Sequence, residues 1–167
     1  MRIRAKHILA LAVVAILAAA ALFFSRPAAA PELRFATLGG EALATSDLRG
    51  KVVLVNFWAT SCVTCVKEMP MLVETHHKFA RRGYETLAVA MSYDHPNLVA
   101  EYARKNALPF RVALDSSGEI AKGFGGVSLT PTTIILDRRG RIVKRYLGEP
   151  DQAELHALLE KSLADPA

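Results

Sequence analysis

The stretch VVLVNFWATSCVTCVKEMP, residues 52–70, joins an apolar run to two cysteines that lie three positions apart. The apolar run, residues 51–58, is nearly continuous, which is typical of a central strand covered on both faces. Residues 62–82 have helical periodicity, and Pro70 inside them is expected to kink the helix without preventing it. The two cysteines are therefore predicted to lie where a buried strand passes into a helix.

Outward from this stretch, strand-like and helix-like segments alternate, which is the pattern of a layered α/β domain. Asp94, His95 and Pro96 form a typical helix start. The expected strands and helices are an opening β element at 33–38, strands at 84–91, 110–114, 132–136 and 141–147, helices at 96–106 and 117–124, and a last helix with a stripe of Leu155, Leu158, Leu159 and Leu163.

The first 30 residues form a separate segment. A basic start is followed by an unbroken apolar run over residues 8–24, and 17 residues at about 1.5 Å each reach roughly 26 Å, within the range of a membrane-spanning helix. The small residues 28–30 also suit a signal-peptide cleavage site. The apolar run over residues 8–24 is, however, longer than the apolar region of most signal peptides. We expect an uncleaved anchor over residues 1–30, with a cleaved signal peptide as the alternative, and one domain over residues 31–167. Either segment delivers that domain outside the cytoplasm.

The net charge of +5 is concentrated in this N-terminal segment. It holds four basic residues and no acidic one, which leaves 17 basic against 16 acidic residues in the remainder. A nucleic-acid partner is therefore not indicated. The basic cluster of Arg138, Arg139 and Arg141 surrounds Gly140 and is predicted to form a solvated hairpin tip.

The only two cysteines, Cys62 and Cys65, are compatible with a structural disulfide, half of a metal site or a redox pair. A bridge across so short a loop contributes only about 2 kcal/mol on the loop-entropy estimate, and a domain of this size does not need it. A structural zinc site needs four ligands, and His76 and His77 are adjacent instead of three to five positions apart, so we expect no metal.

The redox interpretation follows from the predicted junction of strand and helix. Cys62 would lie at the helix N-terminus, where free backbone N–H groups and the helix dipole favour a thiolate. Cys62 is then the attacking thiol. Cys65, one turn further along, would be more buried and would resolve the mixed disulfide, which leaves the pair oxidised.

The residues from Phe57 to Pro70 resemble the active-site region of the thioredoxin superfamily, most closely its exported TlpA/ResA-type branch. The resemblance extends over residues 33–163. It includes the proline that kinks the active-site helix, and Thr130-Pro131, which matches the family's cis-proline loop facing the cysteines. It implies a thioredoxin-like three-layer α/β fold with a central mixed β-sheet, an N-terminal β extension and an inserted helix at 96–106.

The resemblance also implies roles for individual residues. Thr130 and Pro131 would line a substrate groove, in which the backbone of Thr130 pairs with the incoming chain as a β-strand does. The other two predicted substrate-binding residues are Trp58 and Ser61, which stands where the family usually has a tryptophan. For Trp58 we expect a core aromatic at the floor of the site, with a binding platform as the alternative. Glu68 matches an acidic residue that tunes the cysteines or carries a proton, with a solvated helix carboxylate as the alternative.

Two further positions differ from ordinary thioredoxins. Asn56 stands where they carry a buried aspartate, so proton transfer is expected to run differently here. Thr64 replaces the proline that usually precedes the second cysteine, and small changes beside the thiols alter the reduction potential substantially. The sequence therefore does not determine the direction of electron flow, although the resemblance to the TlpA/ResA-type branch favours a reductase.

The resulting hypothesis is a thiol-disulfide oxidoreductase that reduces disulfides in exported proteins, with the Cys-x-x-Cys-His disulfide of apocytochrome c as a natural substrate. Electrons would arrive from a thiol conduit in the bacterial inner membrane, and the domain would face the periplasm, either anchored or soluble after cleavage. No cofactor beyond the redox-active disulfide is expected. The alternatives are a copper-delivery module that uses two thiolates as ligands and a peroxide-reducing redoxin, for which Val55 and Ala59 occupy the positions of required residues.

Overall fold

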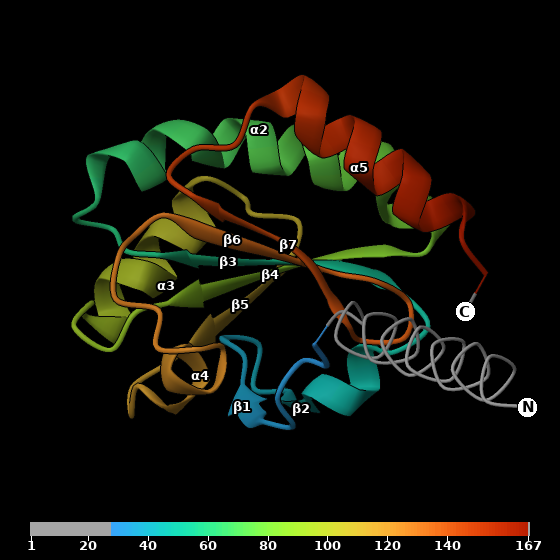
Figure 1. The fold of residues 1–167 in the computed structure, drawn as a ribbon. Helices are drawn as coiled ribbons and strands as arrows, with labels where there is room; N and C mark the ends of the chain where they lie inside the picture. Colours follow the sequence, from blue (N-terminus) through green and yellow to red (C-terminus); the bar gives the residue numbers. More distant parts are fainter. Residues whose placement is uncertain (1–27, 167) are drawn as a thin grey trace, which may run out of the picture.

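A five-stranded mixed sheet forms the centre of the protein in a computed structural model, which describes residues 28–166 (Figure 1). The strand order is β5-β4-β3-β6-β7, in which β3, β4 and β5 run parallel and β6 and β7 are antiparallel to their neighbours. The strands are β3 (Val52–Trp58), β4 (Tyr84–Ala90), β5 (Arg111–Leu114), β6 (Thr132–Leu136) and β7 (Ile142–Leu147).

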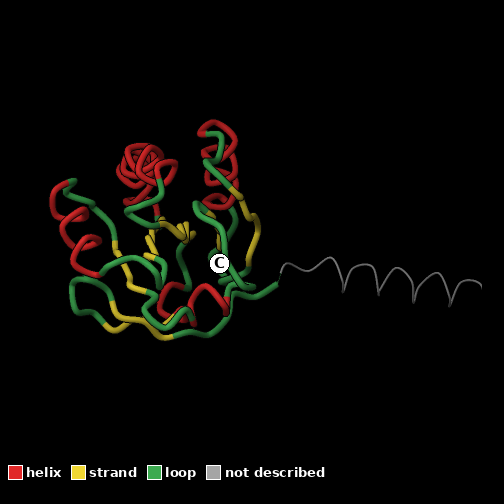
Figure 2. Tube along the Cα trace, turned by 90° about the vertical axis from the view of Figure 1, so that its left-hand side faces the viewer, coloured by secondary structure: helices red, strands yellow, loops and turns green. Residues whose placement is uncertain are grey.

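Helices cover both faces of this sheet, as Figure 2 shows from the side. The residues of α2, α3 and α5 share one apolar cluster with the sheet, and α4 shares a second cluster on the other face with the N-terminal β element. The helices are α2 (Val63–Phe79), α3 (Pro96–Lys105), α4 (Glu119–Gly123) and α5 (Gln152–Ala164), with short 3-10 helices η1 (Thr45–Leu48) and η2 (Ala80–Arg82). The predicted three-layer α/β fold with an inserted helix, α3, is thereby confirmed.

The central strand β3 belongs to both apolar clusters, because successive side chains of a strand point to opposite faces. Leu54 and Trp58 pack with α2, α3 and α5, whereas Val55 and Phe57 pack with α4 and the N-terminal element. All seven residues of β3 are buried, as its apolar run predicted. This strand therefore holds the loop that follows it in a rigid setting.

The opening β element is a two-stranded hairpin that extends beyond the predicted residues 33–38. Strand β1 (Arg34–Ala36) pairs antiparallel with β2 (Ala42–Ala44). Leu38 N then donates to Val112 O at 2.8 Å, and Thr37 forms a bridge with Ala113, so the hairpin covers the edge of β5. Covering an edge strand in this way prevents it from pairing with other chains.

The predicted N-terminal anchor over residues 1–30 lies almost wholly outside the described residues. From residue 28 on, the chain pairs with the start of β7: Ile142 N donates to Ala28 O at 2.7 Å and Ala30 N to Gly140 O at 2.8 Å. None of the helices that the structure describes is long and apolar enough to cross a membrane.

The basic hairpin tip differs from its prediction as a solvated cluster. The guanidinium group of Arg138 donates to Gly50 O at 3.0 Å and to Leu163 O at 3.2 Å. Arg141 forms an ion pair with Asp137 at 2.7 Å. The tip is a hairpin turn as predicted, but it is not simply solvated, because Arg138 reaches neighbouring backbone carbonyls and Arg141 is paired with a carboxylate of the same turn.

Candidate active site

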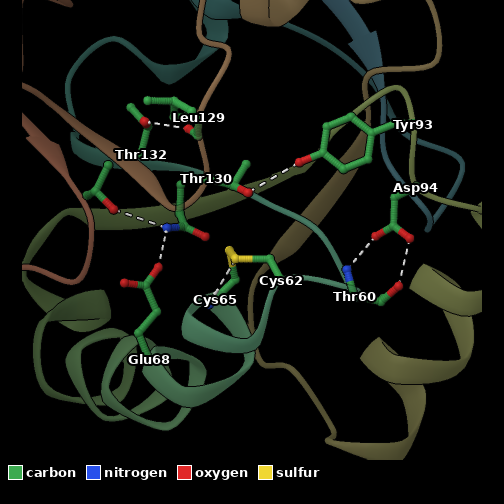
Figure 3. Close-up of a disulfide and its surroundings, with 11 residues drawn as sticks. Thr60, Cys62, Cys65, Glu68, Tyr93, Asp94, Leu129, Thr130 and Thr132 are labelled. Carbon is green, nitrogen blue, oxygen red and sulfur yellow. Dashed lines mark hydrogen bonds between the residues drawn. A yellow bond between two sulfur atoms is a disulfide. The ribbon is translucent and has the colours of Figure 1, made fainter.

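The two cysteines lie at the carboxyl end of β3, where the chain turns into α2 (Figure 3). They form a disulfide with an S–S distance of 2.16 Å and a Cα–Cα distance of 5.2 Å. Cys62 is half-buried and Cys65 is fully buried. Cys65 is therefore the more buried of the two, as expected, and the attacking and resolving roles stay a prediction.

Cys62 is the N-cap residue of α2. Its Sγ accepts a hydrogen bond from Cys65 N at 3.2 Å, and its carbonyl accepts one from Val66 N at 3.0 Å. No acidic residue lies in the first turn of α2. A sulfur at this position is surrounded by the partial positive charge of the helix N-terminus, which favours a thiolate once the disulfide is reduced.

Glu68 lies one turn beyond Cys65 on α2, and its side chain is fully buried. Its Oε1 accepts a hydrogen bond from Asn56 Nδ2 at 2.8 Å, and the same nitrogen lies 3.0 Å from Thr133 Oγ1. Burial raises the pKa of the Glu68 carboxyl to about 7, the hydrogen bond from Asn56 opposes this shift, and the charge of Glu149 adds to it. The alternative of a solvated helix carboxylate was therefore wrong.

Thr130 and Pro131 lie in the loop that leads into β6, and Figure 3 shows Thr130 across the disulfide from Glu68. The peptide bond between them is cis. Thr130 is half-buried and Pro131 is buried. The predicted role of Thr130 in pairing with an incoming chain stays a prediction, and its partial exposure is compatible with it.

The two remaining predicted substrate-binding residues occupy different environments. Ser61 is exposed directly before Cys62. Trp58 is fully buried, and its ring packs against that of Tyr102 at 5.2 Å between centroids. This burial agrees with the expected core aromatic at the floor of the site and not with the alternative of a binding platform, because the last residue of a central strand is covered by α2 and α3.

Two residues that the sequence did not single out also belong to the site. Asp94 accepts hydrogen bonds from Thr60 N and Thr60 Oγ1, each at 2.6 Å. The hydroxyl oxygens of Tyr93 and Thr130 lie 3.2 Å apart. Asp94 was interpreted only as part of a helix start, and no local pattern reveals that the loop after β4 reaches the loop before Cys62.

No cluster of three or more His, Cys, Asp or Glu side chains suited to a metal ion occurs within the described part of the chain. The reactive groups that the site brings together are the thiol pair and a buried acid beside it.

Comparison with known proteins agrees with this geometry. Residues 27–160 match the family described as Redoxin. The chain is 34% identical over 133 residues to the thiol-disulfide oxidoreductase ResA of Bacillus thuringiensis subsp. konkukian, which covers 79% of this chain and 75% of that protein. It is 30% identical over 127 residues to the protein of the same name from Bacillus subtilis, and this match covers 76% of this chain and 70% of that protein.

Solved structures show the same fold. A solution structure of a candidate thioredoxin from Neisseria meningitidis superposes with a TM-score of 0.76 at 34% identity, covering 82% of this chain and 91% of that one. The crystal structure of StoA from Bacillus subtilis superposes with a TM-score of 0.67 at 25% identity, and the match covers 78% of this chain and 98% of that one. With its Cys62–Cys65 disulfide at the start of α2, the chain belongs to the redoxin family and, within it, to the ResA-type thiol-disulfide oxidoreductases.

Proposed function

We propose that this enzyme reduces disulfides of exported proteins, with Cys62 as the attacking thiol and Cys65 as the resolving thiol. The observation that carries the proposal is the unequal setting of the two sulfurs. Cys62 is accessible and accepts the N–H of Cys65, whereas Cys65 is fully buried one turn further along. Cys62 is thus both the more reachable and the better stabilised thiolate.

The reaction proceeds through two exchanges. The Cys62 thiolate attacks a substrate disulfide, a mixed disulfide forms, and the first substrate sulfur leaves and takes up a proton. Cys65 then loses its proton and attacks the Cys62 sulfur, which releases the second substrate thiol and leaves the pair oxidised. The substrate gains two electrons and two protons, and a dithiol of a membrane conduit returns the enzyme to its reduced form.

Glu68 accepts the proton of Cys65 in the second exchange. Its carboxyl lies on the same face of α2 one turn away, and a pKa of about 7 suits a group that both takes and returns a proton near neutral pH. Asn56 holds the carboxyl in place through its 2.8 Å hydrogen bond. Both residues act beside the buried thiol and away from the substrate.

The proposed substrate is an extended chain lying against Thr130, such as the disulfide-containing segment of apocytochrome c. A cis-proline loop beside the reactive sulfur presents backbone groups for pairing with such a chain. The domain works on the periplasmic side of a bacterial inner membrane, held by the basic and apolar segment at its N-terminus.

The assignment is tested by replacing each cysteine in turn. We expect Cys62→Ser to abolish reduction of insulin and of apocytochrome c disulfides, because no thiol remains to attack. Cys65→Ser should instead trap a mixed disulfide between Cys62 and the substrate, visible by mass spectrometry. Retained reduction of either substrate in Cys62→Ser would contradict the proposal.

The direction of electron flow is tested by equilibration with glutathione. A reduction potential near −270 mV, like that of thioredoxin, is expected of a reductant. A value near −120 mV would instead identify an oxidant and contradict this part of the proposal.

A further inference from the structure

The loop between β4 and α3, residues 91–95, connects the two sides of the active site. Met91 N donates to Trp58 O at 3.0 Å, so the loop begins against the end of β3. Asp94 then receives two hydrogen bonds from Thr60, at 2.6 Å each, and its own N–H donates to Met91 O at 2.9 Å. These hydrogen bonds therefore hold the loop against the segment that precedes Cys62.

This loop carries Tyr93, whose side chain lies next to Thr130 of the site. Its hydroxyl lies 3.2 Å from Thr130 Oγ1, yet 60% of the residue remains exposed. Figure 3 shows Tyr93 and Asp94 on the same side of Cys62, with Glu68 on the other. A ring that is fixed in position but open to solvent contributes little to the core and is well placed to meet another molecule.

Two exposed apolar side chains adjoin residues of the site in the sequence. Val63, next to Cys62, is 83% exposed, and Leu129, next to Thr130, is 59% exposed. Exposed apolar side chains near a reactive centre mark a binding surface. Tyr93 adds an aromatic ring to these two aliphatic side chains. A preordered aromatic side chain gives contact area at a low cost in conformational entropy.

We propose that Tyr93 is a specificity-determining residue that binds the apolar or aromatic side chain next to the reacting cysteine of the substrate. This inference rests on the proposed reduction of disulfides in extended chains. The backbone of Thr130 pairs with the substrate, while its side chain contacts Tyr93, so a chain lying on Thr130 passes beside the ring. Asp94 is a positioning residue: it acts through the loop that carries Tyr93 and through Thr60.

The test compares two peptides, each with one internal disulfide, that differ only in having Leu or Asp beside the first cysteine. Rates are measured with the reduced full-length protein in detergent micelles and are divided by the rates of the same peptides with dithiothreitol. We expect the wild type to favour the Leu peptide in kcat/KM by about tenfold, the size of a single apolar contact.

Tyr93→Ala should lower this preference to less than about twofold by raising KM for the Leu peptide. Tyr93→Phe keeps the ring and should keep most of the preference. Neither variant should change the Cys62/Cys65 reduction potential, since the thiols are untouched. Leu98→Ala removes another exposed apolar side chain of the inserted segment, in a hollow that Thr60, Glu101 and Lys105 also line. It leaves the contact between Tyr93 and Thr130 in place and should leave the preference unchanged.

Asp94→Ala should weaken the preference through a higher KM at nearly constant kcat, and Asp94→Asn, which keeps an acceptor for Thr60, should restore part of it. An unchanged preference in Tyr93→Ala, or an equal loss for both peptides, would overturn the inference while leaving the reductase assignment intact. If the wild type reduced neither peptide, the proposed function itself would fail.

Discussion

The protonation of Glu68 is governed by its burial. The side chain is enclosed between α2 and the sheet, where Asn56 donates the hydrogen bond to Oε1 and Oε2 has no partner among the described residues. An ionised carboxylate is poorly solvated in such a setting, which is why its pKa rises to about 7. A group of this kind is protonated in the folded enzyme under conditions in which it would be ionised in the unfolded chain.

This shift predicts that the oxidised domain loses stability as the pH rises toward and through 7. A group whose pKa is raised by folding stabilises the folded state fully below its unfolded pKa, and this contribution is lost as the pH rises through its folded pKa. A rise from 4.5 to about 7 is worth about 3 kcal/mol of unfolding free energy.

Glu68→Gln cannot ionise and keeps an acceptor for Asn56. Urea unfolding at about pH 5 and about pH 8 should therefore show a smaller loss of unfolding free energy in the variant than in the wild type. Identical losses in the two proteins would contradict the raised pKa. The two histidines with lowered pKa values, His76 and His156, are present in both proteins, so their titration cancels in the comparison.

At the scale of elements, the turn between β6 and β7 joins parts of the chain that lie far apart in sequence. Arg138 extends from it to the carbonyl of Gly50, just before β3, and to that of Leu163, near the end of α5. Arg139, its neighbour in the turn, is exposed. Two adjacent arginines thus have different roles that their sequence does not distinguish.

Replacing the two arginines should separate these roles. Arg138→Ala leaves the carbonyls of Gly50 and Leu163 without a charged donor and should lower the unfolding free energy by about 1–2 kcal/mol, since the site is partly exposed to water. Arg139→Ala should change it by less than about 0.5 kcal/mol. Denaturant unfolding of both variants measures the difference, and equal effects would show that the contacts of Arg138 contribute nothing.

At the scale of the whole molecule, the redox site and Ala28, the first described residue, lie at opposite ends of the sheet. Cys62 follows the carboxyl end of β3, where Phe57 pairs with Thr132, the first residue of β6. Ala28 pairs beside the start of β7, where Ile142 faces Leu136 at the other end of β6. The described part of the chain therefore begins at the end of the sheet that lies away from the thiols.

This separation predicts that removing residues 1–27 leaves catalysis intact. A protein beginning at Ala28 keeps its pairing with β7. Its kcat/KM for a peptide disulfide should remain within about twofold of the full-length value in detergent, because we expect the truncation to remove no contact with substrate. A much larger loss would place part of residues 1–27 at the active site.

The anchor itself is tested by fractionating cells that express the full-length chain. We expect the protein to remain with the membranes after a high-salt wash and its intact mass to include residues 1–27, because an apolar run of 17 residues suits insertion. A soluble periplasmic product that lacks the first 30 or so residues would show cleavage instead.

The sequence by itself determined the order of strands and helices, the junction at Cys62 and the redox character of the pair, because periodicity, capping and apolar runs are local properties of the chain. Only the tertiary structure decided the rest. Glu68 becomes a buried acid because α2 packs on the sheet, and Trp58 is covered by the same packing. Tyr93 and Asp94 join the site because parallel strands bring their carboxyl ends to one edge of the sheet, a contact between distant segments that no local pattern records.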